Sequence, residues 1–278
     1  MSVNITAKEV NELRQKTGSG MMDCKKALVE SGGDFEKAID ILRKKGQKVS
    51  EARSNRETSE GIVIYKVSPN EDYSSILSFT CETDFVAKNE EFQDLANKIL
   101  DISFDKRLNS IDDILQLSID GNSVEQHIVN LIGKIGEKIE LREFKSLEGE
   151  KIVPYIHAGN KLGVLVALSG TESVDYVTAG KDIAMQIAAM NPIALNSDEV
   201  DQSVVDKEIE IGKEQALKEG KPENIIEKIA QGKLQKFFKE NTLLSQSFVK
   251  DNSKSVQGYL ESFSPELTVT SFLRVSIG

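Results

Sequence analysis

The N-terminal part of the chain carries apolar residues at helical spacing. Thr6 followed by Glu9 forms the capping-box pattern that begins a helix, and a glycine-rich turn separates this helix from a second one over residues 21–30. A third helix begins after Asp34, with apolar residues at i, i+3, i+4 and i+7, and we expect it to end at Gly46. The pattern predicts a three-helix bundle with a thin core.

Residues 44–60 contain almost no apolar side chains, so they form either a tether or an exposed helix. We place a domain boundary after residue 54. Beyond it, the period of the apolar positions changes from helical to alternating. Residues 61–67 and 73–81 lie on either side of a Ser-Pro-Asn-Glu-Asp turn, and this arrangement predicts a β-hairpin.

Helices and a closing strand follow this hairpin. One helix is capped by Asn89, another begins near Ser123, and the strand covers residues 138–144. The same order of two strands, a helix and a last strand then recurs, over residues 151–157, 161–168, 175–190 and 267–277. We interpret this as a structural pseudo-repeat, although the sequence has no period of the solenoid type.

A polar insert interrupts the second half of the pseudo-repeat. Residues 204–219 and 223–240 predict two helices, and the Gly-Lys-Pro break between them predicts an antiparallel helical hairpin. Such a hairpin buries little of itself, so we expect it to pack on the body, on another subunit or on a partner. The predicted fold class is α+β, with four parts: a bundle (1–54), a first core subdomain (55–145), a second core subdomain (146–196 and 241–278) and the hairpin (197–240). Both core subdomains are expected to hold antiparallel sheets.

Composition limits the classes of function. The net charge of -10 disfavours non-specific binding to nucleic acid or to anionic membrane. The N-terminal segment has no apolar signal region, and the longest apolar stretch, residues 162–168, is too short to cross a bilayer. Cys24 and Cys81 stand far apart and give neither a metal spacing nor a disulfide framework. We expect two buried thiols in a soluble cytoplasmic protein.

The charge is unevenly distributed along the chain. Residues 1–57 contain 12 Lys and Arg and 9 Asp and Glu, whereas the remainder contains 23 and 36. A basic bundle on an acidic body suggests a partner with an acidic patch. The alternative is an ordinary solvated helical surface.

The sequence contains no recognisable catalytic cluster. His127 and His157 fall in different contexts, and neither a nucleophile elbow nor a zinc-binding His-Glu-x-x-His motif is present. The glycine-rich turn at residues 17–20 lacks the spacing and the preceding strand of a phosphate-binding loop. We therefore expect no enzyme, no cofactor and no metal site.

Two stretches carry candidate contact residues. Met21 and Met22 are adjacent, so both cannot face a helix core, and an exposed methionine is an adaptable contact for a partner. Residues 81–89, CETDFVAKN, link a predicted strand to a predicted helix. General rules favour a buried position for Phe85 in this link.

Longer motifs change that expectation for Phe85. LRQKTGSGMMDCKKAL and CETDFVAKNEEF are similar to the two signatures of the bacterial elongation factor Ts family, the guanine-nucleotide exchange factors for elongation factor Tu. HAGNKLGVLV, IAMQIAAMNP and KPENIIEKIAQGKLQKFF resemble the segments that follow in that family. The resemblance covers nearly the whole chain, in order.

The resemblance implies a partner, elongation factor Tu, and a set of contact residues. The bundle is similar to ubiquitin-associated domains and would touch the partner's nucleotide-binding domain. The Thr-Asp-Phe motif would press between helices of that domain and disturb its magnesium site. The implied contact residues are Arg14, Met21, Met22, Lys25, Thr83, Asp84, Phe85, Val86, His157, Phe248 and Val249.

Other interpretations stay open at this point. The helical hairpin serves dimer formation in some family members, so a homodimer is one alternative. The chain ends at Gly278, where family members often continue into a helical module, so we predict no contacts from such a module. A different class of function is an adaptor whose bundle binds ubiquitin-like or other helical ligands. It leaves residues 55–278 unexplained.

Overall fold

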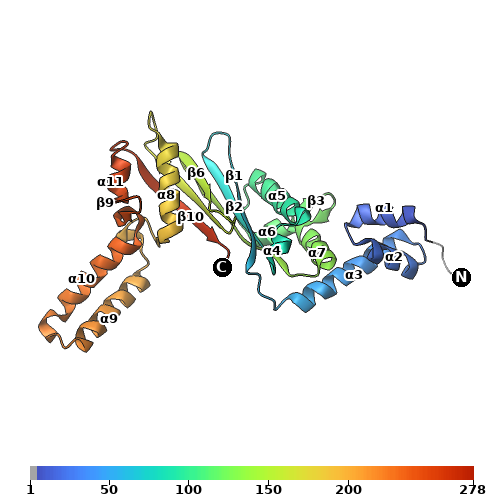
Figure 1. Ribbon diagram of the computed structural model, residues 1–278, viewed down its shortest axis with the longest axis horizontal. Helices are drawn as coiled ribbons and strands as arrows, with labels where there is room; N and C mark the ends of the chain where they lie inside the picture. Colours follow the sequence, from blue (N-terminus) through green and yellow to red (C-terminus); the bar gives the residue numbers. More distant parts are fainter. Residues whose placement is uncertain (1–4) are drawn as a thin grey trace.

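The computed structural model of the protein describes residues 5–278, so the first four residues of the N-terminal segment lie outside it. The molecule is elongated, with the N-terminal bundle at one end, two sheets in the middle and the helical hairpin at the other end (Figure 1). The predicted α+β class is confirmed. The division of the chain at residues 54, 145, 196 and 240 stays a prediction.

Three helices form the N-terminal bundle: α1 (Ala7–Thr17), α2 (Met21–Glu30) and α3 (Phe35–Arg53). Thr6 and Glu9 make both hydrogen bonds of the predicted capping box, and Gly18 ends α1 in the left-handed conformation. The small core consists of seven buried side chains: Val10, Leu13, Cys24, Ala27, Leu28, Ala38 and Leu42.

The third helix ends at Arg53, so the prediction of a stop at Gly46 is wrong. Gly46 lies where α3 crosses α7 (Val124–Ile135). A Cβ atom on Gly46 would stand 3.1 Å from the carbonyl oxygen of Val129, and one on Gly133 would stand 2.9 Å from the Cα of Gly46. The glycine therefore allows two helices to approach closely and does not terminate one. Of the two alternatives for residues 44–60, the helix is correct as far as Arg53.

The first sheet has the order β1-β2-β5, and all its neighbours are antiparallel. Its strands are β1 (Glu60–Val67), β2 (Tyr73–Cys81) and β5 (Ile139–Glu148). The helices α5 (Glu90–Asp105) and α7 pack on it through one large apolar cluster. The smaller elements between them are α4 (Asp84–Ala87), α6 (Ile111–Gln116), β3 (Ser118–Ile119) and β4 (Asn122–Ser123).

The second sheet repeats this plan with the order β10-β7-β6. Its strands are β6 (Lys151–Ile156), β7 (Leu162–Ser169) and β10 (Thr268–Ser276), and α8 (Tyr176–Met190) packs on it. In both sheets the second strand of the hairpin is central and the last strand pairs with it, which confirms the pseudo-repeat. The remaining short elements are η1 (Ser197–Glu199), η2 (Leu243–Ser245), β8 (Ser247–Phe248), β9 (Asp251–Ser255) and α11 (Val256–Glu261).

An apolar cluster shared by both sheets joins the two halves. Val63 and Ile76 from the first sheet meet Leu165 and Val275 from the second. A Cβ on Gly163 would lie 2.7 Å from side-chain carbons of Val63 and Ile76, so the sheets pack closely there. The halves therefore form one continuous scaffold.

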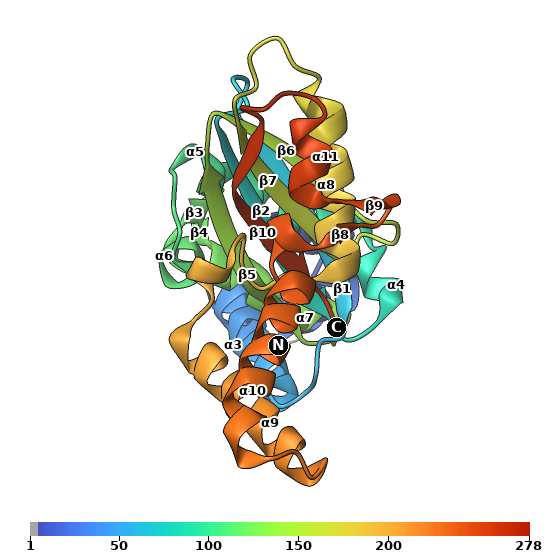
Figure 2. The same cartoon turned by 90° about the vertical axis from the view of Figure 1, so that its left-hand side faces the viewer.

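The insert forms the predicted antiparallel pair, α9 (Gln202–Lys218) and α10 (Glu223–Asn241). The two helices approach closely at Gly212 and Ala230, and the pair extends away from the sheets (Figures 1 and 2). The sequence predicted that the hairpin packs on the body, on another subunit or on a partner. Along its length it does not pack on the body (Figures 1 and 2). Leu217 stays exposed on it.

None of the helices in residues 5–278 combines the length and the apolar character that a membrane-spanning helix needs. Cys24 and Cys81 are both free and buried, as the sequence predicts.

Candidate functional site

The predicted Thr83-Asp84-Phe85 motif lies in the connection between β2 and α5. Thr83 caps the one-turn helix α4, and its hydroxyl accepts a hydrogen bond from the Val86 amide at 3.5 Å. Asn89 caps α5 directly after this turn. The motif therefore forms the N-terminus of α4, at the end of the central strand of the first sheet and shortly before the N-terminus of α5.

The one-turn helix has a buried side and an exposed side. Val86 and Ala87 belong to the apolar cluster of the first sheet. Phe85 points outward and is 83% exposed. A single helical turn is not stable by itself, so the burial of Val86 and Ala87 holds it in place. The turn thus holds an almost fully exposed phenylalanine on a backbone that is anchored from the other side.

Asp84 stands beside Phe85 and forms an ion pair with Lys88 at 2.7 Å. The hydrogen bond from Lys88 holds the pKa of Asp84 below its usual value and raises the pKa of Lys88. Both groups are exposed, so the pair contributes little to folding stability. Its effect is to keep a charged carboxylate next to the exposed ring.

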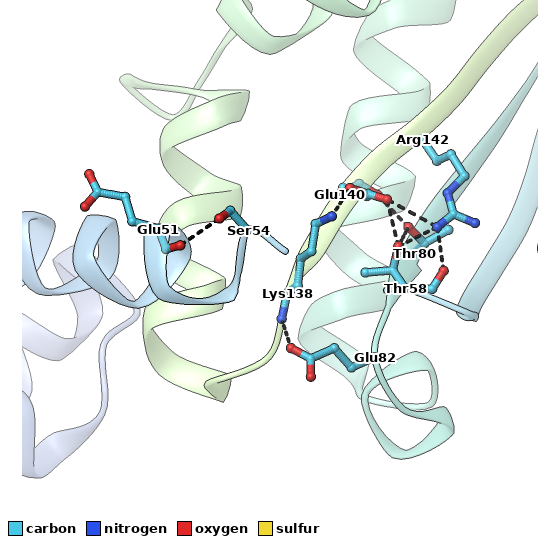
Figure 3. Close-up of polar contacts among 8 residues, drawn as sticks. All are labelled: Glu51, Ser54, Thr58, Thr80, Glu82, Lys138, Glu140 and Arg142. Carbon is cyan, nitrogen blue, oxygen red and sulfur yellow. Dashed lines mark hydrogen bonds and ion pairs between the residues drawn. The ribbon is translucent and has the colours of Figure 1, made fainter. Parts of the chain in front are cut away.

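Two glutamates fix the backbone where β2 leads into this turn. The carboxylate of Glu137 accepts hydrogen bonds from the Thr83 amide at 3.0 Å and from the Thr83 hydroxyl at 2.8 Å. The carboxylate of Glu82 accepts a bond from the Lys138 amide at 2.7 Å, which Figure 3 shows, and pairs with Arg53 at 3.1 Å. These bonds continue the pairing of β2 with β5 beyond the last ladder pair by means of side chains.

The thiol of Cys81 lies directly beneath the turn and donates to the Thr83 carbonyl oxygen at 3.2 Å. Burial raises its pKa to about 12, and the nearby Glu137 carboxylate adds to the increase. Since the thiolate is the reactive form, Cys81 is a packing residue and not a nucleophile.

A second polar network anchors the chain between α3 and β1. Thr58 is buried, and its hydroxyl donates to Glu140 at 2.7 Å and accepts from Thr80 at 2.9 Å (Figure 3). Arg142 donates to the Thr58 carbonyl oxygen at 2.6 Å. Burial alone would raise the pKa of Glu140, but Lys138 and Thr58 together hold it below its ordinary value. The network ties the segment that follows the bundle to the first sheet.

Comparisons with known proteins identify the family of the chain. Residues 82–278 match the family described as Elongation factor TS. Curated proteins named Elongation factor Ts from Amoebophilus asiaticus and Cytophaga hutchinsonii are 53% and 54% identical to the chain over 274 residues. These alignments cover 99% and 98% of this chain and 99% of each relative. The chain belongs to the elongation factor Ts family. It is therefore a translation elongation factor.

The bundle residues that the elongation factor Ts resemblance implies are exposed. Arg14 and Lys25 face solvent, and Met21 and Met22 are 57% and 63% exposed. The sequence required only one of the two methionines to be exposed, and both are. Val29 on the same helix is also exposed, and the sequence analysis missed it because a valine in a helical pattern is usually assigned to the core.

The residues implied in the second half of the elongation factor Ts core are mixed in exposure. His157 is exposed, and the Tyr155 hydroxyl lies 2.8 Å from its Nδ1. Val249 is 40% exposed and lines an open hollow of about 540 Å³ together with Met190. Phe248 is only 2% exposed and stacks on Tyr259 with ring centroids 4.0 Å apart.

Two of the implied contact residues differ from the others in burial, and the contact roles of all eleven stay predictions. Val86 and Phe248 are buried, so neither side chain is offered to a partner in this structure. Each packs beneath an exposed neighbour, Phe85 and Val249 respectively. A signature matched as a continuous run cannot separate the side chain that is presented from the one that supports it.

The implied residues do not form one cluster. α2, α4 and β9, the strand with which β8 pairs, lie in succession along the long axis of the molecule (Figure 1). Among residues 5–278, no group of three or more His, Cys, Asp and Glu is arranged to hold a metal ion. Glu82 and Glu137 were not predicted from the sequence. The backbone amides that they bind, those of Lys138 and Thr83, lie more than 50 positions away in the chain.

Proposed function

We propose that this elongation factor Ts family member is a guanine-nucleotide exchange factor. It binds elongation factor Tu with GDP, promotes release of GDP and allows GTP to bind. The observation that carries the proposal is Phe85, 83% exposed on a turn whose other side is buried. Asp84 and Phe85 are the residues that reach the partner's nucleotide domain and disturb its magnesium and phosphate site.

Exchange of this kind needs no covalent chemistry, so the proposed factor is not an enzyme with its own active site. A protein that binds the nucleotide-free state of a GTPase more tightly than the GDP-bound state lowers the affinity for GDP by the same factor. The contact that matters is one that is made only in the open state. A presented side chain next to a charged carboxylate is suited to such a contact.

One buried phenylalanine is large enough to have a measurable effect. Burying its side chain stabilises a complex by about 1.5–3 kcal/mol. A factor of ten in affinity corresponds to about 1.4 kcal/mol. If the ring is buried only in the nucleotide-free complex, Phe85 alone accounts for a change of about tenfold to a hundredfold in nucleotide affinity.

The other exposed residues support contacts along the same partner. The proposed additional contacts are the Met21–Met22 surface of the bundle, with Arg14 and Lys25 at its edge, and the His157 and Val249 surfaces of the second half. We place the protein in the cytoplasm, with no direct nucleic-acid partner, and keep a homodimer through the α9–α10 hairpin as a further proposal.

Release of a fluorescent GDP analogue from elongation factor Tu tests this function. We expect the chain to accelerate release in a saturable manner, and we expect excess GDP to weaken the complex, because the coupling is reciprocal. A release rate that is unchanged at every concentration of the chain contradicts the proposal. Retention of a helical ligand by the bundle without any effect on release would instead favour the adaptor.

A further inference from the structure

Glu137 holds the entrance to α4 from outside that helix. It follows Gly136, which ends α7 in the left-handed conformation, and it precedes β5. Its two carboxylate oxygens accept hydrogen bonds from the amide and the hydroxyl of Thr83. Within residues 5–278, Glu137 forms no ion pair with Lys or Arg. The Glu137 carboxylate therefore acts on Thr83, whose amide and hydroxyl it holds in place.

These two bonds set the direction in which the turn leaves the sheet. Thr83 is the residue immediately before Asp84 and Phe85. Its own cap bond to the Val86 amide is long, at 3.5 Å, whereas the bonds to Glu137 are 2.8 and 3.0 Å. Hydrogen bonds to a carboxylate are stronger than those between neutral groups. The orientation of Thr83 thus depends more on Glu137 than on α4 itself.

The second half of the core contains the same contact in a different setting. Thr171 follows the end of β7 by two residues, as Thr83 follows the end of β2. The amide and the hydroxyl of Thr171 both donate to the carboxylate of Glu150, and the amide bond is 3.0 Å. The chain then continues to α8 without a short helix and without an aromatic residue.

The repetition separates a structural role from a functional one. A threonine at the end of the central strand is bonded by a glutamate in both halves, but Glu137 precedes the last strand of its sheet, β5, whereas Glu150 precedes the first strand of its half, β6. Only in the first half is this threonine followed by an exposed phenylalanine. The two glutamates therefore share the contact with a threonine amide and hydroxyl, and Glu150 accepts a further hydrogen bond from the Gly170 amide at 3.2 Å. Glu137 has an exposed phenylalanine to position and Glu150 has none.

We propose that Glu137 is a positioning residue for nucleotide exchange. It acts through Thr83 to fix the angle at which Phe85 meets the partner, and it does not touch the partner's nucleotide. The inference rests on the proposed exchange function and deepens it. It identifies a residue outside the Thr-Asp-Phe motif on which the action of the motif depends.

The test compares Glu137→Ala with Glu150→Ala in the GDP release assay, with the full-length chain. Losing two charge-assisted hydrogen bonds at Thr83 is expected to lower the saturating release rate about tenfold. The concentration of chain that gives half of the maximal effect should change much less, because the bundle and second-half contacts remain. Glu150→Ala is expected to leave the saturating rate unchanged.

Two further variants keep the test decisive. In Glu137→Gln the amide oxygen can accept from the Thr83 amide and the NH2 group can donate to the hydroxyl, so most of the rate should return. In a Phe85→Ala background, Glu137→Ala should have a much smaller further effect, because the ring that it positions is removed and only Asp84 remains on the same turn. If Glu137→Ala does not fold, Thr83→Val, which removes the hydroxyl alone, is expected to give a smaller loss in rate.

The outcomes distinguish this inference from the function on which it rests. Unchanged release with Phe85→Ala would overturn the proposed role of the presented ring. Slow release with Phe85→Ala but normal release with Glu137→Ala would overturn the positioning role alone. Equal losses for Glu137→Ala and Glu150→Ala, or independent effects of Glu137→Ala and Phe85→Ala, would also overturn it.

Discussion

Phe85 lies in the first half of the core and Phe248 in the second, and their environments are opposite. Phe85 is 83% exposed at the end of β2, whereas Phe248 is 2% exposed in β8 and stacks on Tyr259. The resemblance to the family assigned both of them to the partner surface. The difference shows that two aromatic residues implied by one resemblance can differ completely in burial.

The largest effect on folding stability is expected for Phe248. Replacing this buried, stacked ring with alanine should lower the free energy of unfolding by about 3–5 kcal/mol, because a cavity remains beneath the β8–β9 turn. Urea denaturation followed by circular dichroism measures the loss. A midpoint equal to that of the wild type would mean that the ring is not part of the core.

Val249, the exposed neighbour of Phe248, should show the reverse behaviour. Val249→Ala is expected to weaken binding to elongation factor Tu by about 1 kcal/mol, or about fivefold in Kd. The unfolding midpoint should stay that of the wild type, since the side chain is 40% exposed. Titration calorimetry with the nucleotide-free GTPase provides the Kd. An unfolding midpoint that falls while the Kd is unchanged would reverse the assignment of the two residues.

Acid should weaken the network that ties the segment between α3 and β1 to the first sheet. The pKa of Glu140 in the folded protein lies below its value in the unfolded chain, which is about 4.3. Its contribution to stability is therefore complete above about pH 4.3 and is lost as the pH falls through the lower folded value. Glu140→Gln should reduce the slope of stability against pH in this range. An unaltered slope would show that the network around Thr58 does not depend on this charge.

Phe85→Ala should have the smallest effect on folding. An exposed side chain makes few contacts to lose, so the free energy of unfolding should change by no more than about 0.5 kcal/mol. Leu217→Ala, an exposed apolar residue on the hairpin, provides a control with the same kind of truncation. Destabilisation by Phe85→Ala well beyond that of the control would place the ring in the core after all.

Local sequence patterns predicted most of the fold. Capping residues such as Thr6, Asp34 and Asn89 act over one turn of helix, so their signals lie within a few positions and were correct. Gly46 was misinterpreted because its role depends on α7, some 80 residues later in the chain. A glycine that ends a helix and one that admits a neighbouring helix look the same in a single sequence.

The candidate site was only partly predictable for the same reason. General burial rules place Phe85 in the core, and only the family signature indicated that it is presented. Glu137 belongs to no local pattern, since its partner Thr83 is brought to it by the pairing of β2 with β5. The residues that carry a contact can be found from a motif, whereas those that orient it require the folded structure.

The most direct test of the account is the rate of GDP release from elongation factor Tu with saturating Phe85→Ala compared with saturating Leu217→Ala. The account predicts that release with the Leu217 variant matches the wild type, and that release with the Phe85 variant is slower by about tenfold to a hundredfold. Both variants should remain folded. Equal release rates with the two folded variants would contradict the central claim that Phe85 is the side chain through which this protein acts.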